Sequence, residues 1–126
     1  MLDPGAGSLA FANAGHNPPV IVRASGKAEM LEGGGPPLGI LPLARYREMR
    51  AQLDPGDALA IYSDGVTEAS NAAQEEFGEE RLSDVLSRRR AEPAAAMVQA
   101  VTEALTEFAA GSPPADDITL MVARRL

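Results

Sequence analysis

The sequence predicts an α+β domain in which antiparallel β-sheets are flanked by helices, and two observations support this fold class. Short apolar stretches bounded by Gly, Pro and Asn fill the first half of the chain, whereas the second half has the apolar spacing of helices and ends in one more strand. Strands followed by helices are typical of α+β domains, because α/β folds alternate the two regularly. The 126 residues are enough for one domain, residues 1–126, and too few for two of ordinary size.

Five apolar stretches are predicted to form strands before the helical region. They are Ser8–Asn13, Pro19–Arg23, Ala28–Leu31, Tyr46–Leu53 and Ala58–Tyr62. The first three are short and separated by turn residues, a pattern that predicts an antiparallel meander. The segment Gly33–Pro37 consists of three glycines and two prolines, so we expect a loop before the fourth strand.

Two helices and a final strand are predicted in the second half of the chain. Residues Glu79–Arg90 carry apolar side chains three and four positions apart, with acidic residues in the first turn and arginines in the last, which suits the helix dipole. Residues Pro93–Ala110 also have one apolar face, and the glycine and prolines that follow end this helix. The last apolar stretch, Asp117–Arg124, closes the chain as a strand.

The composition excludes several classes of function. A formal net charge of −7 and an isoelectric point near 4.6 disfavour binding to nucleic acid or to an anionic membrane, because such partners require a basic surface. Without cysteine, a metal would have to be held by oxygen atoms or by the single histidine, His16. No apolar stretch reaches the roughly 20 residues that span a bilayer, and the N-terminus does not resemble a secretory signal. We therefore expect a soluble, cytoplasmic domain.

Acidic residues adjoin two of the predicted strands. Asp64 follows the nearly continuous apolar stretch Ala58–Tyr62, and Asp116 and Asp117 precede the last strand. If these strands are antiparallel neighbours, Asp64 and Asp116 lie at the same end of the sheet. Two interpretations remain open: Asp64 caps a turn, or the carboxylates form a hard oxygen site suited to Mg²⁺ or Mn²⁺.

Other polar residues near these turns are weaker candidates for a site. Asn13 and His16 share a turn, where the histidine either bonds within its own loop or has a catalytic role. Glu68 and Asn71 follow Asp64 and could orient water near a metal, although polar surface residues are common at such positions. Gly65 permits a tight corner that would turn the Asp64 side chain outward.

Several motifs occur together in a characteristic order along the chain. They are Phe11–Pro19, Pro37–Ile40, Gly56–Asp57 with Tyr62–Ala69, Phe77–Gly78 with Arg81–Leu82, and Asp116–Leu120. The ordered set resembles the metal-dependent serine/threonine protein phosphatases of the protein phosphatase 2C superfamily. Within that superfamily it resembles the bacterial branch of sporulation stage II E and sigma-factor-regulating phosphatases. The resemblance extends from about Leu9 to Arg124.

The resemblance implies a fold of two packed antiparallel sheets flanked by helices, with a metal cluster at one end of the sandwich. By position, Asp64 and Asp116 would be ligands of Mg²⁺ or Mn²⁺, and Asp117 would lie beside them. Such enzymes use no catalytic residue beyond a metal-bound water, which attacks the phosphorus of a phosphoserine or phosphothreonine. The branch suggests a regulatory phosphoprotein substrate, such as an anti-sigma-factor antagonist.

In the family, a further half domain precedes the stretch that corresponds to Asn13–His16, and the aspartate of its Asp-Gly motif bridges two metal ions. Residues 1–12 contain no Asp-Gly pair. We therefore expect the chain to be the C-terminal half of a phosphatase domain, with weak metal binding and little or no turnover alone. Strands that normally pair with the other half would favour self-association. The alternative function is a non-catalytic, phosphatase-like interaction module that binds a regulatory partner.

Overall fold

The computed structural model describes residues 1–114 and 116–126. The elements, in chain order, are β1 (Ser8–Phe11), β2 (Val20–Val22), β3 (Ala28–Met30), β4 (Met49–Gln52), β5 (Ala58–Tyr62), α1 (Asp64–Thr67), α2 (Gly78–Arg88), α3 (Ala94–Ala109) and β6 (Leu120–Arg124). The predicted α+β order is confirmed. The short helix α1 was not predicted, because a single turn is too short to show an apolar period.

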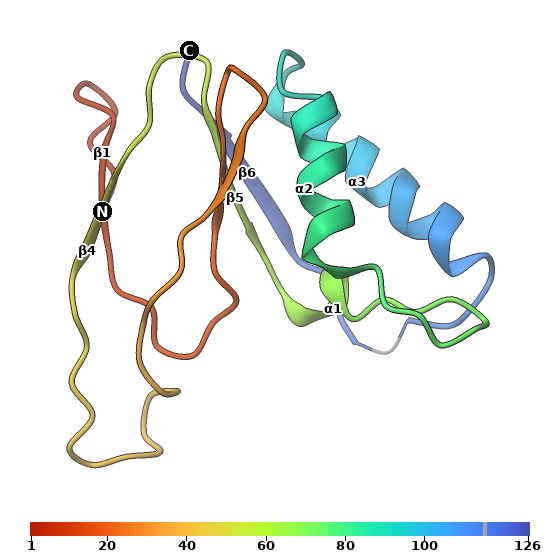
Figure 1. The fold of residues 1–126 in the computed structure, drawn as a ribbon, viewed down its shortest axis with the longest axis horizontal. Helices are drawn as coiled ribbons and strands as arrows, with labels where there is room; N and C mark the ends of the chain where they lie inside the picture. Colours follow the sequence, from red (N-terminus) through yellow and green to blue (C-terminus); the bar gives the residue numbers. More distant parts are fainter. Residues whose placement is uncertain (115) are drawn as a thin grey trace.

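Three layers make up the fold, and the strands β1–β6 that the structure describes pair antiparallel (Figure 1). The middle layer is a four-stranded sheet in the order β3-β2-β5-β6. Helices α2 and α3 cover one face of this sheet, and the two-stranded sheet β1-β4 covers the other. The prediction of antiparallel sheets flanked by helices is therefore correct.

The predicted meander of the first three strands is wrong in one respect. β2 and β3 form an antiparallel pair, but β1 pairs with β4, with Ser8 opposite Gln52, and belongs to the other sheet. Two prolines, Pro18 and Pro19, precede β2 and cannot donate ladder hydrogen bonds. The chain therefore crosses between layers here, and Leu9 of β1 packs onto the face of the four-stranded sheet.

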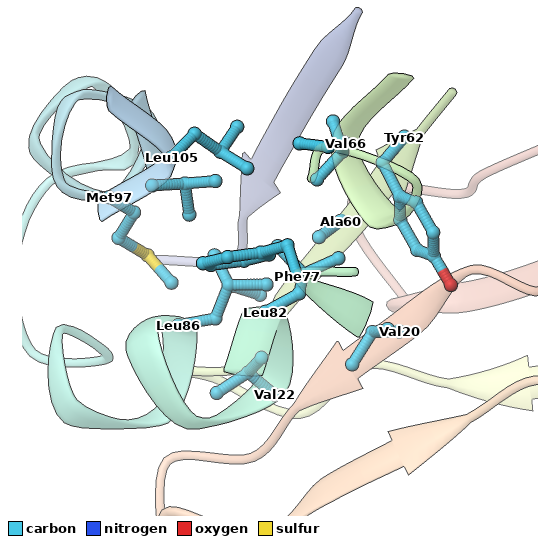
Figure 2. Close-up of a cluster of buried hydrophobic side chains, with 13 residues drawn as sticks. Val20, Val22, Ala60, Tyr62, Val66, Phe77, Leu82, Leu86, Met97 and Leu105 are labelled. Carbon is cyan, nitrogen blue, oxygen red and sulfur yellow. The ribbon is translucent and has the colours of Figure 1, made fainter. Parts of the chain in front are cut away.

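The main core lies between the four-stranded sheet and the helices (Figure 2). Apolar side chains of the sheet meet Leu82 and Leu86 of α2 and Met97 of α3, all fully buried. Phe77, just before α2, packs edge-on against Phe108 of α3 with ring centroids 5.5 Å apart. Full burial of a leucine side chain stabilises the fold by about 2 kcal/mol. The burial of Leu82, Leu86 and Met97 therefore holds both helices against the sheet.

β5 is an inner strand of the four-stranded sheet and carries the candidate site at its end. Its residues pack alternately into the two cores, Ala58, Ala60 and Tyr62 against the helices and Leu59 against β1-β4. This burial on both faces confirms the expectation from the continuous apolar stretch. None of the helices in residues 1–114 and 116–126 has the length and apolar character required to cross a bilayer.

Candidate metal centre

The end of β5 and the start of β6 lie side by side at one end of the sheet. The strands are antiparallel, and their final pair joins Tyr62 to Leu120. The predicted common position of Asp64 and Asp116 required these two strands to be antiparallel neighbours, and they are. Asp64 follows β5, Asp116 precedes β6, and both are exposed to solvent. The fold thus brings the two acidic segments to the same end of the sheet.

Ser63 connects these segments through three hydrogen bonds. Its backbone N–H donates to the carbonyl oxygen of Thr119 (2.9 Å), and its hydroxyl donates to the carbonyl oxygen of Asp117 (3.0 Å). The same hydroxyl accepts the N–H of Thr119 at 2.9 Å. One backbone bond and two bonds of the Ser63 hydroxyl therefore join the two segments beyond the last pair of the β5-β6 ladder, up to the acidic residues.

Gly65 allows the backbones to approach closely at the same point. A Cβ atom on Gly65 would collide with the carbonyl oxygen of Asp117 and would lie 3.1 Å from that of Asp116. Gly65 is buried within α1 and does not have a positive φ angle. The expected tight corner is therefore not the reason for this glycine; the close approach of the Asp116–Asp117 backbone is.

The exposed carboxylates at this end of the sheet offer the oxygen atoms that a hard cation prefers. Asp116 Oδ1 accepts the N–H of Asp117 at 2.7 Å, which orients its carboxylate, and the carbonyl of Asp64 accepts the N–H of Glu68 at 2.8 Å within α1. Exposed carboxylate oxygens suit Mg²⁺ or Mn²⁺. Among the residues that the structure describes, however, no three His, Asp or Glu side chains gather into a metal-binding group. Asp64 and Asp116 are therefore candidate ligands of a partial site, which stays a prediction.

The Asn13–His16 turn is held by its own hydrogen bonds. The buried Asn13 side chain accepts the N–H of His16 at 2.8 Å and donates to the carbonyl of His16 at 2.9 Å. The exposed imidazole contacts the carbonyl oxygen of Asn17 through Nδ1 at 3.0 Å. These contacts favour the interpretation that the histidine bonds within its own loop.

The Asn71 side chain is hydrogen-bonded within its own turn, whereas the Glu68 side chain is not. Asn71 Oδ1 accepts the N–H groups of Ala73 and Glu75, and its Nδ2 donates to the Glu75 carboxylate at 3.0 Å. Its side chain thus closes a turn. Glu68 is exposed directly after α1 and keeps its carboxylate free of any hydrogen bond among those found in the described residues.

Two residues that hold this end of the sheet together were not among the predicted site residues. Ser63 was not a candidate, although a hydroxyl between an apolar strand and Asp64 is a signal that could have identified it. Tyr62 is 1% exposed, and its hydroxyl donates to Glu79 of α2 at 3.2 Å. Burial and the Glu79 carboxylate raise the pKa of Tyr62 well above its ordinary value, so the hydroxyl stays a donor that ties β5 to α2.

Comparison with known proteins gives consistent matches. The family model described as stage II sporulation protein E matches residues 1–126. Protein IcfG of Synechocystis sp. is 31% identical over 125 residues, which are 99% of this chain and 20% of that protein. The SiaA-PP2C domain of Pseudomonas aeruginosa matches with a TM-score of 0.81 at 25% identity, over 94% of this chain and 46% of that one.

Two further solved structures have the same fold. The RsbU and RsbW domains of Rv1364c from Mycobacterium tuberculosis match with a TM-score of 0.70 at 26% identity, over 98% of this chain and 34% of that one. The Mn-presoaked phosphatase domain of SpoIIE from Bacillus subtilis matches with a TM-score of 0.75 at 18% identity, over 98% of this chain and 53% of that one.

The chain spans a fifth of the curated relative and about a third to half of these solved structures. The match to the family model covers every residue, and the ordered motifs and the α+β sheets agree with it. The chain therefore belongs to the stage II sporulation protein E family of PP2C-type serine/threonine phosphatases.

Proposed function

We propose that this chain supplies one part of the metal site of a phosphoserine/phosphothreonine protein phosphatase that acts on a bacterial regulatory phosphoprotein. Asp64 and Asp116 would hold Mg²⁺ or Mn²⁺, with Asp117 beside them. A bound divalent ion would supply an activated water and would neutralise charge on the phosphoryl group. The observation that carries the proposal is the junction at Ser63 and Gly65, which brings the two acidic segments together.

The protein's own residues would define the geometry of this site. The pairing of β5 with β6 fixes the two backbones, and the orientation of the Asp116 carboxylate is set by the N–H of Asp117. The described residues bring two acidic segments together but contain no group of three His, Asp or Glu side chains that could hold a metal ion. We therefore expect weak metal binding and little or no turnover by this chain alone, with further ligands from water or from another part of the phosphatase.

The partner class follows from the family. The similarity to a protein with RsbU and RsbW domains supports a partner in sigma-factor regulation, such as a phosphorylated anti-sigma-factor antagonist. The chain's net charge of −7 is consistent with a protein partner and unfavourable for nucleic acid.

A Mn²⁺ titration of the purified chain tests the metal site. Asp64→Asn removes one ligand charge with little change in size, and we expect it to abolish most of the Mn²⁺ binding seen by calorimetry. Asp84→Asn is the matched control, because Asp84 is an exposed carboxylate on α2 that pairs with Arg88. We expect this control to bind Mn²⁺ as the wild type does. Equal binding by wild type and Asp64→Asn would exclude the site.

A hydrolysis assay tests the activity separately. We expect the wild-type chain to release no more phosphate from a phosphoserine peptide than a blank with Mn²⁺ alone. Efficient metal-dependent hydrolysis by this chain would show that it holds a complete site. Absence of both metal binding and hydrolysis would instead favour the non-catalytic interaction module, which needs no metal.

A further inference from the structure

Ser63 occupies the residue position before the first residue of α1, where a serine commonly caps a helix. A capping hydroxyl accepts an N–H from the second or third helical residue. The Ser63 hydroxyl makes no such bond with α1. It instead donates to Asp117 and accepts from Thr119, so both hydrogen-bonding roles of the hydroxyl are directed toward the other acidic segment. Helix capping therefore does not explain this residue.

The place of these bonds in the sheet suggests a different role. The β5-β6 ladder ends at the pair Tyr62 and Leu120, immediately before the acidic segments. Beyond this pair, the N–H and hydroxyl of Ser63 provide the hydrogen bonds that keep the two backbones together. Asp64 is the next residue on one side, and Asp117 and Asp116 follow Thr119 in reverse order on the other.

We propose that Ser63 is a positioning residue, whose hydroxyl bridge to Asp117 and Thr119 sets the separation of the Asp64 and Asp116 carboxylates. This inference rests on the proposed function, because it assigns Ser63 a role in the same metal site. Ser63 touches neither metal nor substrate. It acts by holding the backbones of the two ligand segments before the ion arrives, which lowers the cost of assembling the site.

Matched variants test this role through Mn²⁺ affinity. Ser63→Ala removes the hydroxyl, and Ser63→Thr retains it in the extended backbone conformation of this residue. We expect Ser63→Ala to bind Mn²⁺ about tenfold more weakly than wild type, the smaller end of the effects seen for residues that orient metal ligands. Ser63→Thr should restore most of the affinity. Urea unfolding and circular dichroism of each variant report separately on stability and fold.

The outcomes distinguish the inference from the proposed function. If wild type and Asp64→Asn bind Mn²⁺ equally, the metal site itself is excluded. If Asp64→Asn weakens binding while Ser63→Ala does not, the site stands and the role of Ser63 is overturned. If Ser63→Thr binds Mn²⁺ as weakly as Ser63→Ala, the role is also overturned, because the loss of affinity would then not be due to the loss of the hydroxyl.

A measurement on the wild type avoids any folding defect in the variants. If the Ser63 bridge favours metal binding, metal binding must favour the bridge by the same factor. Saturating Mg²⁺ should therefore slow hydrogen exchange of the Thr119 amide, which donates to the Ser63 hydroxyl. The Gly26 amide, which donates to the Arg23 carbonyl in the turn between β2 and β3, serves as a control that can exchange by local opening and should not change. Unchanged exchange at Thr119, in a protein that binds the ion, would contradict the inference.

Discussion

Arg23 binds the buried carboxylate of Asp57, with 2.7 Å between Nη1 and Oδ2. The Asp57 side chain is 3% exposed, and its two oxygens also accept the N–H groups of Ala24 (2.8 Å) and Asp54 (2.9 Å). Arg23 Nη1 donates further to the carbonyl of Gln52 at 2.6 Å. This network joins the ends of β2, β4 and β5, at the end of β5 opposite Asp64.

Replacing Asp57 by asparagine should destabilise the fold by about 2 kcal/mol, because it removes a buried carboxylate that accepts hydrogen bonds from Arg23, Ala24 and Asp54. Arg23 keeps its pair with Glu29 at 2.7 Å, so its own charge stays compensated. Urea unfolding monitored by circular dichroism measures the change. Asp84→Asn, which breaks the exposed pair with Arg88, is the control and should cost less than about 1 kcal/mol. Similar unfolding midpoints for the two variants would contradict a structural role for the buried pair.

Asp57 should also make the fold sensitive to acid. Burial raises the pKa of its carboxyl, but the Arg23 guanidinium and the N–H groups of Ala24 and Asp54 outweigh this effect and hold the pKa below its ordinary value of 3.8. Because the folded-state pKa is the lower one, the stabilisation is complete above the ordinary pKa and is lost as the pH falls through the folded-state value.

Urea midpoints measured from neutral pH down to strongly acidic pH test this dependence. Wild type should lose stability below about pH 4, and Asp57→Asn should lose less over the same range. Some slope should remain in the variant, because hydrogen bonds from Arg23 and Lys27 lower the pKa of Glu29 as well. Parallel curves for the two proteins would show that Asp57 does not contribute to acid sensitivity.

The sequence predicted the parts of the fold that depend on neighbouring residues, and the structure added those that depend on distant ones. The convergence of Asp64 and Asp116 could be anticipated, because each adjoins an apolar strand. The pairing of β1 with β4 could not, because it is determined by the packing of Leu9 with Ile21, Leu53 and Leu59, residues far apart in the sequence. The bridge by Ser63 depends in the same way on a segment more than fifty residues away.

Gly65→Ala should disturb the candidate metal centre directly. The added Cβ would collide with the Asp117 carbonyl oxygen and lie 2.8 Å from its carbonyl carbon, and backbone atoms cannot move aside as a flexible side chain can. We expect a loss of about 2 kcal/mol in unfolding free energy, within the range for overpacking in a well-packed region. Separation of the two acidic segments should also weaken Mn²⁺ binding, measured by calorimetry.

Thr67→Ala is the control for this variant. Thr67 lies in the same helical turn, and within residues 1–114 and 116–126 its hydroxyl makes one long hydrogen bond, 3.4 Å to the carbonyl of Asp64. Its removal should leave Mn²⁺ affinity nearly unchanged. If Gly65→Ala bound Mn²⁺ as well as Thr67→Ala does, the close approach of the two backbones would not be required for the site.

The chain should self-associate through the β1-β4 side of the molecule. A loop before β4 exposes four large apolar side chains to 56–92%: Leu38, Ile40, Leu41 and Leu43. β4 has β1 as its one neighbouring strand among the described residues, so backbone groups at its other edge remain available for pairing. A groove of about 770 Å³ also runs along these two strands. Apolar side chains beside an open strand edge favour association with another copy.

Light scattering after size-exclusion chromatography tests this expectation over a range of protein concentrations. Wild type should show a mass above that of a monomer, rising with concentration, and the double variant Leu38→Ser/Leu43→Ser should shift the equilibrium toward monomer. Leu126→Ser is the control, because Leu126 is 99% exposed at the C-terminus, which lies far from this loop in Figure 1. A monodisperse wild-type monomer at every concentration would contradict the prediction. An equal effect of the control would show that association depends on general hydrophobicity and not on the loop before β4.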